Sequence, residues 1–569
     1  MELKIARRGC PGEVGDATLH PVLRRAYAAR GVRDSAELAL TLDRLMPVGT
    51  LEGVDAAVRL ILEHRERRII VIGDFDADGA TSTALIVRCL RAWGFASVDF
   101  LVPNRFEFGY GLTPEIVGLA AERSPTLIVT VDNGISSNAG VAAARERGIQ
   151  VLVTDHHLPG PVLPEADVIV NPNVSGSTFG SKALAGVGVA FYVMAALRRE
   201  IDARGNVVMP PVTDFLDLVA LGTVADLVPL DTNNRVLVAQ GIRRIRAGRA
   251  VPGIRALLSI GNRSVATVTA ADLGFTLGPR LNAAGRLDDM SIGIRCLLAE
   301  TDSEALALAT RLDQLNAERR EIEARMQVMA LAAVSHLRER EEEGPTRQGV
   351  CLFDPDWHQG VVGLVASRIK DRIRRPVIAF ARAGDGQLRG SARSVTGIHI
   401  RDVLDGMAAR HPQLISRFGG HAMAAGLSLE EANLDAFARA FDEEVSRWRD
   451  PGIPANHVET DGELTSEEIA LETAQALREG GPWGQAFPEP CFDGRFAVKN
   501  ARVVGEKHLK MWVTSGDGAR SFDAIAFNFK GADENPPLPA GDVHLVYRLD
   551  INEYKGERRL QLLVDHVLP

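Results

Sequence analysis

Short apolar runs alternate with stretches rich in Ala and Leu between residues 68 and 172. The runs are four to six residues long and rich in β-branched residues, which predicts buried strands separated by helices. Such an alternation is typical of an α/β domain with a mainly parallel sheet. The predicted strands are IIVIG 69–73, VDFLVP 98–103, LIVTV 127–131, VLVT 151–154 and VIVNP 168–172.

The stretch from Thr301 to Gly344 contains no Pro, and no Gly before its last residue. Its apolar residues are spaced for one long amphipathic helix that starts near Asp302 or Ser303 and is about 60 Å long at 1.5 Å per residue. A helix packed within the first domain is the simpler interpretation, but the length and the following GPT favour a rigid connection between two domains. The apolar positions are Leu308, Leu312, Leu315, Ile322, Met326, Met329 and Ala333.

Residues 349–448 repeat the α/β pattern, with strands near VCLF and PVIAFA and a helix over VVGLVASRIKDRI. A Pro-rich break, RDPGIPANH, separates them from a last segment of short β-rich runs, which predicts a small antiparallel barrel of the OB type. We expect an N-terminal segment (1–50), a first α/β domain (51–300), a connecting helix (301–345), a smaller α/β domain (346–450) and the barrel (451–569).

The composition is that of a folded protein. The 569 residues are 46% hydrophobic and 24% charged, which excludes a disordered or fibrous chain and corresponds to three or four domains of roughly 150 residues each. The net charge of −9 excludes a uniformly basic surface. A nucleic-acid partner would therefore need a localised positive patch.

Membrane and disulfide chemistry are not indicated. The longest uncharged stretch, Ala183 to Leu197, has 15 residues, fewer than the roughly 20 that cross a bilayer. The first residues lack the apolar run of a signal peptide, so we expect no membrane span and a cytoplasmic location. The five cysteines lie far apart without a C-x-x-C pair, which argues against a disulfide framework and a thiolate zinc site. A metal would be held by oxygen and imidazole.

Three carboxylates follow the first predicted strand. In GDFDADG, Asp74, Asp76 and Asp78 stand at alternate positions before the next helix. The string also matches the opening of an EF-hand loop, but position twelve of that loop would be Leu85 in place of Glu, and a strand precedes it where an EF-hand has a helix. A magnesium or transition-metal site at the sheet edge is the better hypothesis.

Further acids and two histidines follow later segments. LIVTVDNG puts Asp132 at a strand end, VLVTDHH puts Asp155, His156 and His157 at another, and Asp226 lies in an apolar turn, LGTVAD. Because ligands bind beyond the carboxyl ends of strands in open α/β sheets, these groups should converge. A helix cap explains any single Asp more simply, but not four clusters at comparable positions. Carboxylates with imidazoles suit Mn²⁺ or Mg²⁺, and two such ions can promote displacement at phosphorus.

Several of these sequence motifs resemble those of a known enzyme superfamily. GDFDADG, TVDNG, VTDHH and GTVAD are similar to the four motifs of the DHH phosphoesterases, and RFGGHAMAAG resembles the GGH motif of the associated DHHA1 domain. Within that superfamily the chain most resembles the RecJ family of 5′→3′ exonucleases specific for single-stranded DNA. The resemblance runs from about residue 50 to the terminal barrel and includes FEFGYGL, GPRLNAAGRLDD and WHQGVVGLVASRI. DHH alone is a weak pattern, whereas the ordered set is specific.

The resemblance implies a site for two ions, Mn²⁺ or Mg²⁺, with Asp132 bridging both. Asp74, Asp155 and His157 would be supporting catalytic residues, with Asp155 orienting His156. His157 would either touch the scissile phosphate or assist protonation of the leaving oxygen. The implied metal ligands are Asp76, Asp78, Asp132, His156 and Asp226.

A local excess of positive charge lies between residues 350 and 428, where eleven Lys and Arg against six Asp give a net charge of +5. Such an excess suits a groove that follows phosphates, although a solvated helix face explains IKDRIRR alone. Ser391 and Arg393 lie on a predicted strand in this segment. Gly419, Gly420 and His421 are predicted to form a turn whose backbone N–H groups cradle an anion, although the glycines could be simple turn formers.

The resemblance assigns this segment to substrate binding, near the 5′ terminal phosphate. Arg280, Asn282 and Arg286 lie in a predicted loop punctuated by glycines, and Arg105 and Tyr110 could contact phosphate or stack on a base. The predicted substrate-binding residues are Arg105, Tyr110, Arg280, Asn282, Arg286, Ser391, Arg393, Gly419, Gly420 and His421.

We therefore predict a metal-dependent exonuclease that releases mononucleotides from single-stranded DNA in recombination and repair. Its expected partners are a single-stranded-DNA-binding protein and a helicase, and we expect a monomer. An enzyme for oligoribonucleotides or cyclic dinucleotides is an alternative, for which the long helix and barrel would be superfluous. A non-catalytic single-strand-binding protein is another, which the complete set of acids and histidines disfavours. Trp512, Phe522 and Phe527 of the barrel are candidates for base stacking, but core packing explains them equally well.

Overall fold

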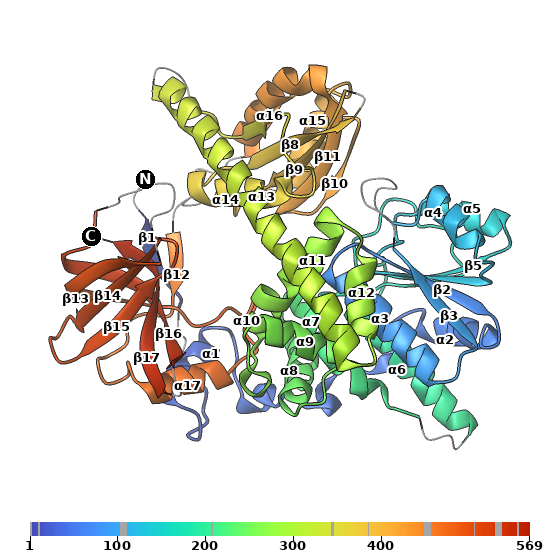
Figure 1. The fold of residues 1–569 in the computed structure, drawn as a ribbon, viewed down its shortest axis with the longest axis horizontal. Coiled ribbons are helices and arrows are strands. Elements are labelled where there is room, and N and C mark those ends of the chain that lie inside the picture. The colour runs from blue at the N-terminus through green and yellow to red at the C-terminus, as the bar shows by residue number, and fades with distance from the viewer. Residues whose placement is uncertain are drawn as a thin grey trace. The chain divides into compact units, whose positions relative to one another are not determined.

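The chain forms two compact units in the computed structural model. Their helices and strands are labelled in Figure 1. The first consists of Gly9–Asn316 and Ala470–Pro490, and the second of Met1–Arg8, Ala317–Ile469 and Cys491–Pro569. The structure describes residues 3–9, 12–102, 111–205, 209–342, 346–384, 386–448, 457–505, 507–529, 537–554 and 557–568.

The first unit is built on a parallel sheet of β2 (Arg68–Gly73), β3 (Ser97–Leu101), β4 (Leu127–Val131), β5 (Gln150–Thr154) and β6 (Val168–Val170). The strand order is β3-β2-β4-β5-β6. The central strands are almost entirely Val, Ile and Leu and are buried along their length, as expected for strands covered on both faces. The predicted α/β class with a parallel sheet is confirmed.

Helices cover both faces of this sheet. The side chains of Ile70, Ile128 and Val151 lie in one core cluster with residues of α4 (Pro114–Ala121) and α5 (Asn138–Glu146). The alternate residues of these strands point to the other face, where α3 (Ala77–Ala92) and α6 (Gly186–Arg204) contact β2 and β4. The candidate site lies at the carboxyl edge of the sheet, between these layers.

A helical layer completes the first unit. Two segments in it that we expected to be irregular are helical: LGTVAD ends α7, and GPRLNAAGRL forms α11. Their glycines serve close packing, because a Cβ at Gly222 would lie 2.2 Å from Thr81 Oγ1 and one at Gly285 would lie 1.8 Å from the Phe75 carbonyl oxygen. The layer contains α7 (Leu216–Ala225), α8 (Thr232–Arg246), α9 (Pro252–Ile260), α10 (Ala270–Asp272), a π-helical turn (Leu273–Leu277), α11 (Gly278–Leu287) and α12 (Ser291–Leu298).

The first unit also includes a segment from late in the chain, Ala470–Pro490, which packs near its N-terminal helix. It includes α1 (Pro21–Ala28), α2 (Val54–Glu63) and α17 (Leu471–Glu479). The Tyr27 hydroxyl donates a 2.6 Å hydrogen bond to the Gly480 carbonyl oxygen, and the Arg235 guanidinium lies 3.9 Å from the Phe487 ring centroid. These contacts hold residues 470–490 in the first unit, whereas the residues before and after them in sequence belong to the second.

The predicted long helix is confirmed as α13 (Asp302–Glu342), which carries the chain from the first unit into the second. Its buried residues include Ala305, Leu312, Met326 and Val334, at the spacing of one helical stripe.

In the second unit, five strands form a sheet of order β10-β11-β9-β8-β7. Only β7 and β8 are parallel; the other pairs are antiparallel. The predicted turn at Gly419 and Gly420 is wrong, because both glycines belong to β10 and pair with β11, which leaves the turn to the residues that follow. The elements are β7 (Val350–Phe353), α14 (Val362–Ile373), β8 (Val377–Gly384), β9 (Gln387–Arg393), α15 (Ile400–Arg410), β10 (Arg417–Gly420), β11 (Ala424–Glu430) and α16 (Leu434–Trp448).

The predicted OB-like barrel is confirmed, but it is not antiparallel throughout, because the strands at 521–526 and 557–568 pair in parallel. Its strands close in the order β13-β14-β15-β17-β16. Beside it, β1 (Lys4–Arg7) and β12 (His457–Thr460) form a parallel pair. None of the described helices has the combination of length and apolarity needed for a membrane crossing. The barrel strands are β13 (Phe492–Val504), β14 (His508–Ser515), β15 (Ser521–Ala526), β16 (Gly541–Tyr554) and β17 (Glu557–Leu568).

Candidate active site

The acidic loop after β2 is held by helix N-termini. The Asp76 carboxylate caps α3 by accepting a 3.0 Å hydrogen bond from the Gly79 amide. Asp78, which is buried in the first turn of α3, accepts hydrogen bonds of 2.6 Å and 2.9 Å from the amides of Gly186 and Val187 at the start of α6. These amide dipoles stabilise a carboxylate in a place where water cannot.

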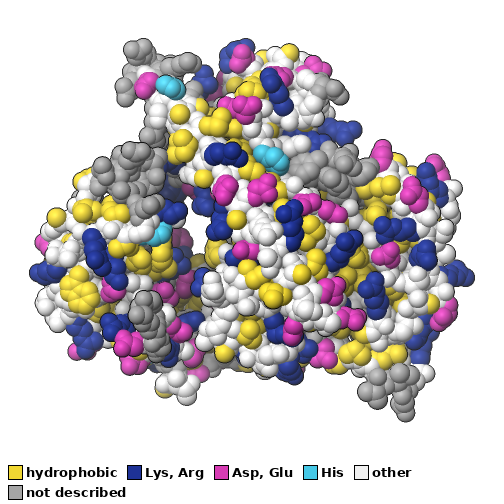
Figure 2. All heavy atoms as spheres, in the orientation of Figure 1, with side chains coloured by type: hydrophobic (Ala, Val, Ile, Leu, Met, Phe, Trp, Pro, Cys, Tyr) yellow, Lys and Arg dark blue, Asp and Glu magenta, His cyan; other side chains and the backbone are white. Residues whose placement is uncertain are grey.

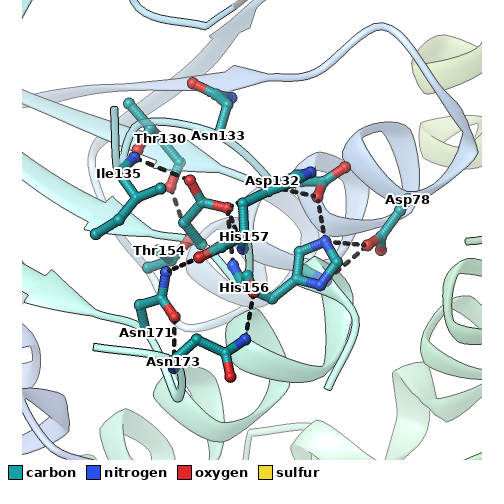
Figure 3. A network of polar contacts seen from close by, with 12 residues as sticks. Asp78, Thr130, Asp132, Asn133, Ile135, Thr154, His156, His157, Asn171 and Asn173 are labelled. Carbon is teal, nitrogen blue, oxygen red and sulfur yellow. Dashed lines mark hydrogen bonds and ion pairs between the residues drawn. The ribbon is translucent and has the colours of Figure 1, made fainter. Parts of the chain in front are cut away.

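The carboxylates of Asp78 and Asp132 lie beside the imidazole of His156 (Figure 3), and that of Asp226 lies close to the same ring nitrogen. His156 Nε2 lies 3.0 Å from Asp132 Oδ1, 3.5 Å from Asp226 Oδ2 and 4.0 Å from Asp78 Oδ2. Asp132 follows β4 with a positive φ of 60°, a strained conformation for a residue other than glycine and one that often marks a functional position. The predicted convergence of the acids with His156 is therefore seen in the structure.

The side chain of Asp132 requires a glycine beside it. A Cβ at Gly186 would lie 2.7 Å from the Asp132 Cβ, closer than carbon atoms pack. The glycine at the start of α6 therefore lets Asp132 and Asp78 approach the same helix end.

The buried carboxylates of this cluster repel one another, and bound cations would relieve this repulsion. Burial, reinforced by the neighbouring carboxylates, raises the pKa of Asp132 and of Asp226 well above the usual range. Burial and the charge of Asp76 raise the pKa of Asp78 to about 7, although the amides of α6 oppose this. Carboxylates buried together are costly unless positive charge compensates them.

Potential ligand atoms lie in overlapping groups, each with its atoms within 4.8 Å of one another. Asp132 and His156 each belong to two of these groups. Oxygen-rich donor sets with one or two imidazoles fit Mn²⁺ or Mg²⁺. The three groups are Asp74, Asp76 and Asp132; Asp78, His156 and Asp226; and Asp132, His156 and His157.

Asp155 bonds to the ring of His157, whereas its contact with His156, which we expected it to orient, is to the backbone amide. The His157 Nδ1 atom lies 2.7 Å from Asp155 Oδ1, and the same oxygen accepts hydrogen bonds from the backbone amides of His156 and His157. Burial opposes the ionisation of Asp155, but the hydrogen bond and the charge of the histidines outweigh it and lower the pKa of Asp155. Burial likewise disfavours the charged ring of His157, but Asp155 raises the pKa of His157 to about 9.

Residues of α11 support the acidic loop. The Asn282 side-chain oxygen accepts a 2.7 Å hydrogen bond from the Ala77 amide at the start of α3, and Gly285 lies against the Phe75 carbonyl. Arg280 forms a salt bridge of 2.8 Å to Asp313 and donates to the Thr276 carbonyl. We expected Arg280 and Asn282 to bind substrate. No spacing in the sequence indicates that Asn282 instead contacts a loop 205 residues away.

In the second unit, Ser391 and Arg393 lie on β9 as predicted, and their side chains are 3.0 Å apart. Burial lowers the pKa of Arg393, yet among the residues that the structure describes no carboxylate forms a salt bridge with it. The His421 amide donates to the Ala424 carbonyl, so this group serves the hairpin. A half-buried guanidinium that donates to a hydroxyl and one carbonyl, with no carboxylate partner among the described residues, is suited to an anion.

Three other expected features have different outcomes. Arg105 and Tyr110 lie outside the described residues. In the barrel, Phe522 is buried and packs edge-on against Phe496, whereas Trp512 and Phe527 are 49% and 55% exposed. Basic and acidic side chains are interspersed over the face in Figure 2, in keeping with the absence of a uniformly basic surface.

Three family models match the chain. The DHH family, N-terminal domain, matches residues 68–223, the DHHA1 domain matches residues 347–447, and the RecJ OB domain matches residues 460–566. The first range contains β2 to β6 and most of the acidic cluster, and the last contains the closed barrel.

Relatives match over nearly the whole length. The chain is 53% identical over 560 residues to the single-stranded-DNA-specific exonuclease RecJ of Escherichia coli, covering 97% of this chain and 96% of the relative. It is 51% identical to RecJ of Haemophilus influenzae, with both chains covered completely. The structure is similar to that of Thermus thermophilus RecJ in complex with Mn²⁺, with a TM-score of 0.79 and 29% identity over 100% of this chain and 79% of the other. The chain therefore belongs to the RecJ family of single-stranded-DNA-specific exonucleases.

Proposed function

We propose that the protein is a metal-dependent 5′→3′ exonuclease that hydrolyses single-stranded DNA to mononucleotides in DNA recombination and repair. The observation that supports this best is the set of buried carboxylates around His156 Nε2, with Asp132 shared between two groups of potential ligands. Divalent cations held by such carboxylates would neutralise negative charge on the phosphodiester and activate a water molecule for its hydrolysis.

Asp76, Asp78, Asp132, His156 and Asp226 hold two divalent cations in this proposal, Mn²⁺ or Mg²⁺, with Asp132 as the bridge. Asp74 lies in one of the ligand groups and supports Asp76. When bound, such ions lower the pKa of a water molecule and neutralise charge on the phosphate. The α6 amides keep Asp78 fixed, so the donor set is ordered before an ion arrives.

His157 faces the substrate in this proposal. Its side chain is 28% exposed, against 12% for that of His156. The hydrogen bond to Asp155 fixes the ring and favours its charged form, as the raised pKa of about 9 indicates. A protonated ring in this position is suited to contact the scissile phosphate and to give its proton to the leaving oxygen.

Arg393 and Ser391 supply a phosphate-binding position on β9. Within the described part of the chain, the Arg393 side chain donates to the Ser391 hydroxyl and the Ala392 carbonyl and forms no salt bridge with a carboxylate, so its positive charge is left for an anion. We assign this position to the 5′ terminal phosphate of the strand. The glycines of β10 belong to the same region of the sheet, next to β11, which pairs with β9.

The test is digestion of matched single-stranded DNA, RNA and duplex, each labelled at the 5′ or the 3′ end, with and without Mn²⁺. We expect labelled mononucleotides to appear at once only from 5′-labelled single-stranded DNA with Mn²⁺. Preference for RNA would favour an oligoribonucleotide phosphodiesterase, and binding without cleavage would favour a non-catalytic single-strand-binding protein.

The same activity suggests the cellular setting. A nuclease of this specificity needs single strands, so we propose a helicase and a single-stranded-DNA-binding protein as partners, a cytoplasmic location and a monomeric enzyme. Co-purification and size-exclusion chromatography with light scattering test the partners and the monomer.

A further inference from the structure

The two histidines of the DHH sequence have backbone groups held by side chains from both sides. On one side, Asp155 Oδ1 accepts from the amides of His156 and His157, at 2.8 Å and 3.1 Å. On the other side, the Asn173 side-chain amide donates to the His156 carbonyl at 2.5 Å, and that of Asn171 donates to the His157 carbonyl at 2.9 Å. Figure 3 shows both contacts.

The two asparagines follow β6 in the sequence VNPN and belong to none of the acidic or histidine motifs. Asn171 is 2% exposed, so its amide is committed to the protein interior. Its side-chain oxygen accepts a 2.7 Å hydrogen bond from the Asn173 backbone amide, which couples the two residues. The two asparagines are therefore linked to each other while each donates to a histidine carbonyl.

The loop that carries this pair is itself fastened. Lys182 Nζ donates to the carbonyls of Pro172 and Ser177, at 2.6 Å and 2.8 Å. The Glu52 carboxylate accepts from the Ser177 hydroxyl and from the amide and hydroxyl of Thr178, all within 2.8 Å. A loop tied at both ends by charged groups can hold a neighbouring loop in one place.

We propose that Asn171 and Asn173 are positioning residues that fix the imidazoles of His156 and His157 in the geometry needed to bind the metal ions and meet the substrate. They act through the backbone, because a shift of either carbonyl turns the attached ring away from the carboxylates. The ring centroids of the two histidines are only 4.5 Å apart, so movement of one ring displaces the other. This inference rests on the proposed metal-dependent activity.

Replacement by leucine removes the N–H donor of asparagine but keeps a branched side chain. Leucine has the same number of side-chain heavy atoms and the same branching as asparagine, although it is bulkier, and it cannot donate. Asn173→Leu and Asn171→Leu therefore remove the hydrogen bonds to the carbonyls while leaving no cavity. Outer residues of this kind typically change metal affinity by roughly 10- to 100-fold. Asn138, which donates to the Val162 carbonyl on the exposed part of α5, supplies the matched control as Asn138→Leu.

The experiment is titration of the metal-free full-length variants with Mn²⁺ by calorimetry and electron paramagnetic resonance, with the melting temperature measured in parallel. We expect Asn173→Leu to bind Mn²⁺ at least roughly 10-fold more weakly than wild type, with Asn138→Leu unchanged. A second variant, Asn173→Gln, keeps the donor on a longer arm and should recover part of the loss. If Asn171→Leu proves too unstable to measure, the Asn173 variants decide the matter, because that residue is less buried.

Wild-type Mn²⁺ affinity in Asn173→Leu would overturn the positioning role. The outcome is separable from the proposed function, since wild-type protein that binds Mn²⁺ but leaves single-stranded DNA intact would contradict the nuclease activity and not the role of the asparagines.

Discussion

The Asp155 carboxylate reaches the ring of His157 and not that of His156: His157 Nδ1 lies 2.7 Å from Asp155 Oδ1. The three residues are consecutive, yet the two histidine rings contact different carboxylates. His156 turns toward Asp132 and Asp226, whereas His157 is tied to the buried carboxylate that precedes them both. A histidine among the proposed metal ligands and a histidine for the substrate thus come from one dipeptide.

Asp155→Asn should impair the role of His157 more than that of His156. The amide can still fill the space, but it no longer favours the charged ring of His157. We expect a decrease of roughly 10- to 100-fold in the rate of single-strand degradation with Mn²⁺ affinity changed less, because the ring of His156 does not bond to Asp155. Measurement of kcat and KM with a labelled oligonucleotide and of Mn²⁺ binding by calorimetry checks this, and an equal loss of both would place Asp155 with the ligands.

Asp132→Asn should abolish Mn²⁺-dependent degradation and make the metal-free protein more stable. Burial and four neighbouring carboxylates raise the pKa of Asp132, so its removal relieves a strain that the metal-free protein carries. We expect a gain of about 1 kcal/mol in the free energy of unfolding, as found when strained functional residues are replaced. Denaturation in the presence of a chelator measures it.

The control is Asp55→Asn, a substitution of an exposed aspartate in α2. It should leave both activity and stability unchanged. Retained nuclease activity in Asp132→Asn would contradict the site assignment.

Arg393→Ala should weaken binding of single-stranded DNA and reduce the salt dependence of that binding by the equivalent of about one phosphate contact. The matched control is Arg382→Ala on β8, because Arg382 already forms a salt bridge of 2.7 Å with Glu431. Fluorescence anisotropy at several salt concentrations, with Ca²⁺ to suppress cleavage, gives both slopes. An unchanged slope for Arg393→Ala would give this residue a purely structural role.

Gly285→Ala should disturb the acidic loop although alanine favours helices. A Cβ there would lie 1.8 Å from the Phe75 carbonyl oxygen, so α11 or the loop that carries Asp74 and Asp76 has to shift. We expect weaker Mn²⁺ binding and a loss of stability of roughly 1–3 kcal/mol. Gly118→Ala in α4 is the control, since its Cβ meets nothing within 4 Å and the change should be neutral or slightly stabilising.

Asp493 in the barrel should make stability depend on pH. Burial opposes its ionisation, but Arg7, Thr460 and His544 outweigh this by hydrogen bonding and lower its pKa below the ordinary value of 3.8. A lowered pKa in the folded state means that the stabilisation is present above about pH 4 and is lost as the pH falls further. Melting temperatures from pH 3 to pH 7 should therefore fall less steeply below pH 4 in Asp493→Asn than in wild type. Asp542→Asn, at an exposed position of β16, should follow the wild type.

The sequence alone determined the strands of the parallel sheet, the helix α13, the barrel and the residue types of the site. Runs such as IIVIG are recognisable because a strand buried on both faces has to be apolar throughout. Asp132 and His156 were identifiable because the carboxyl ends of parallel strands meet at one edge, so topology brings them together wherever the exact side chains point.

Only the tertiary structure decided which groups touch. Gly222, Gly285 and Gly420 were interpreted as turn formers, but they lie in helices or a strand where another backbone or side chain comes too close for a Cβ. The partner of Asp155, the contact of Asn282 with Ala77 and the hold of Asn173 on His156 join segments by hydrogen bonds that leave no period or spacing in the sequence. Hydrophobic patterning fixes which elements form, whereas directional contacts depend on distances of a few tenths of an ångström that exist only once those elements have packed.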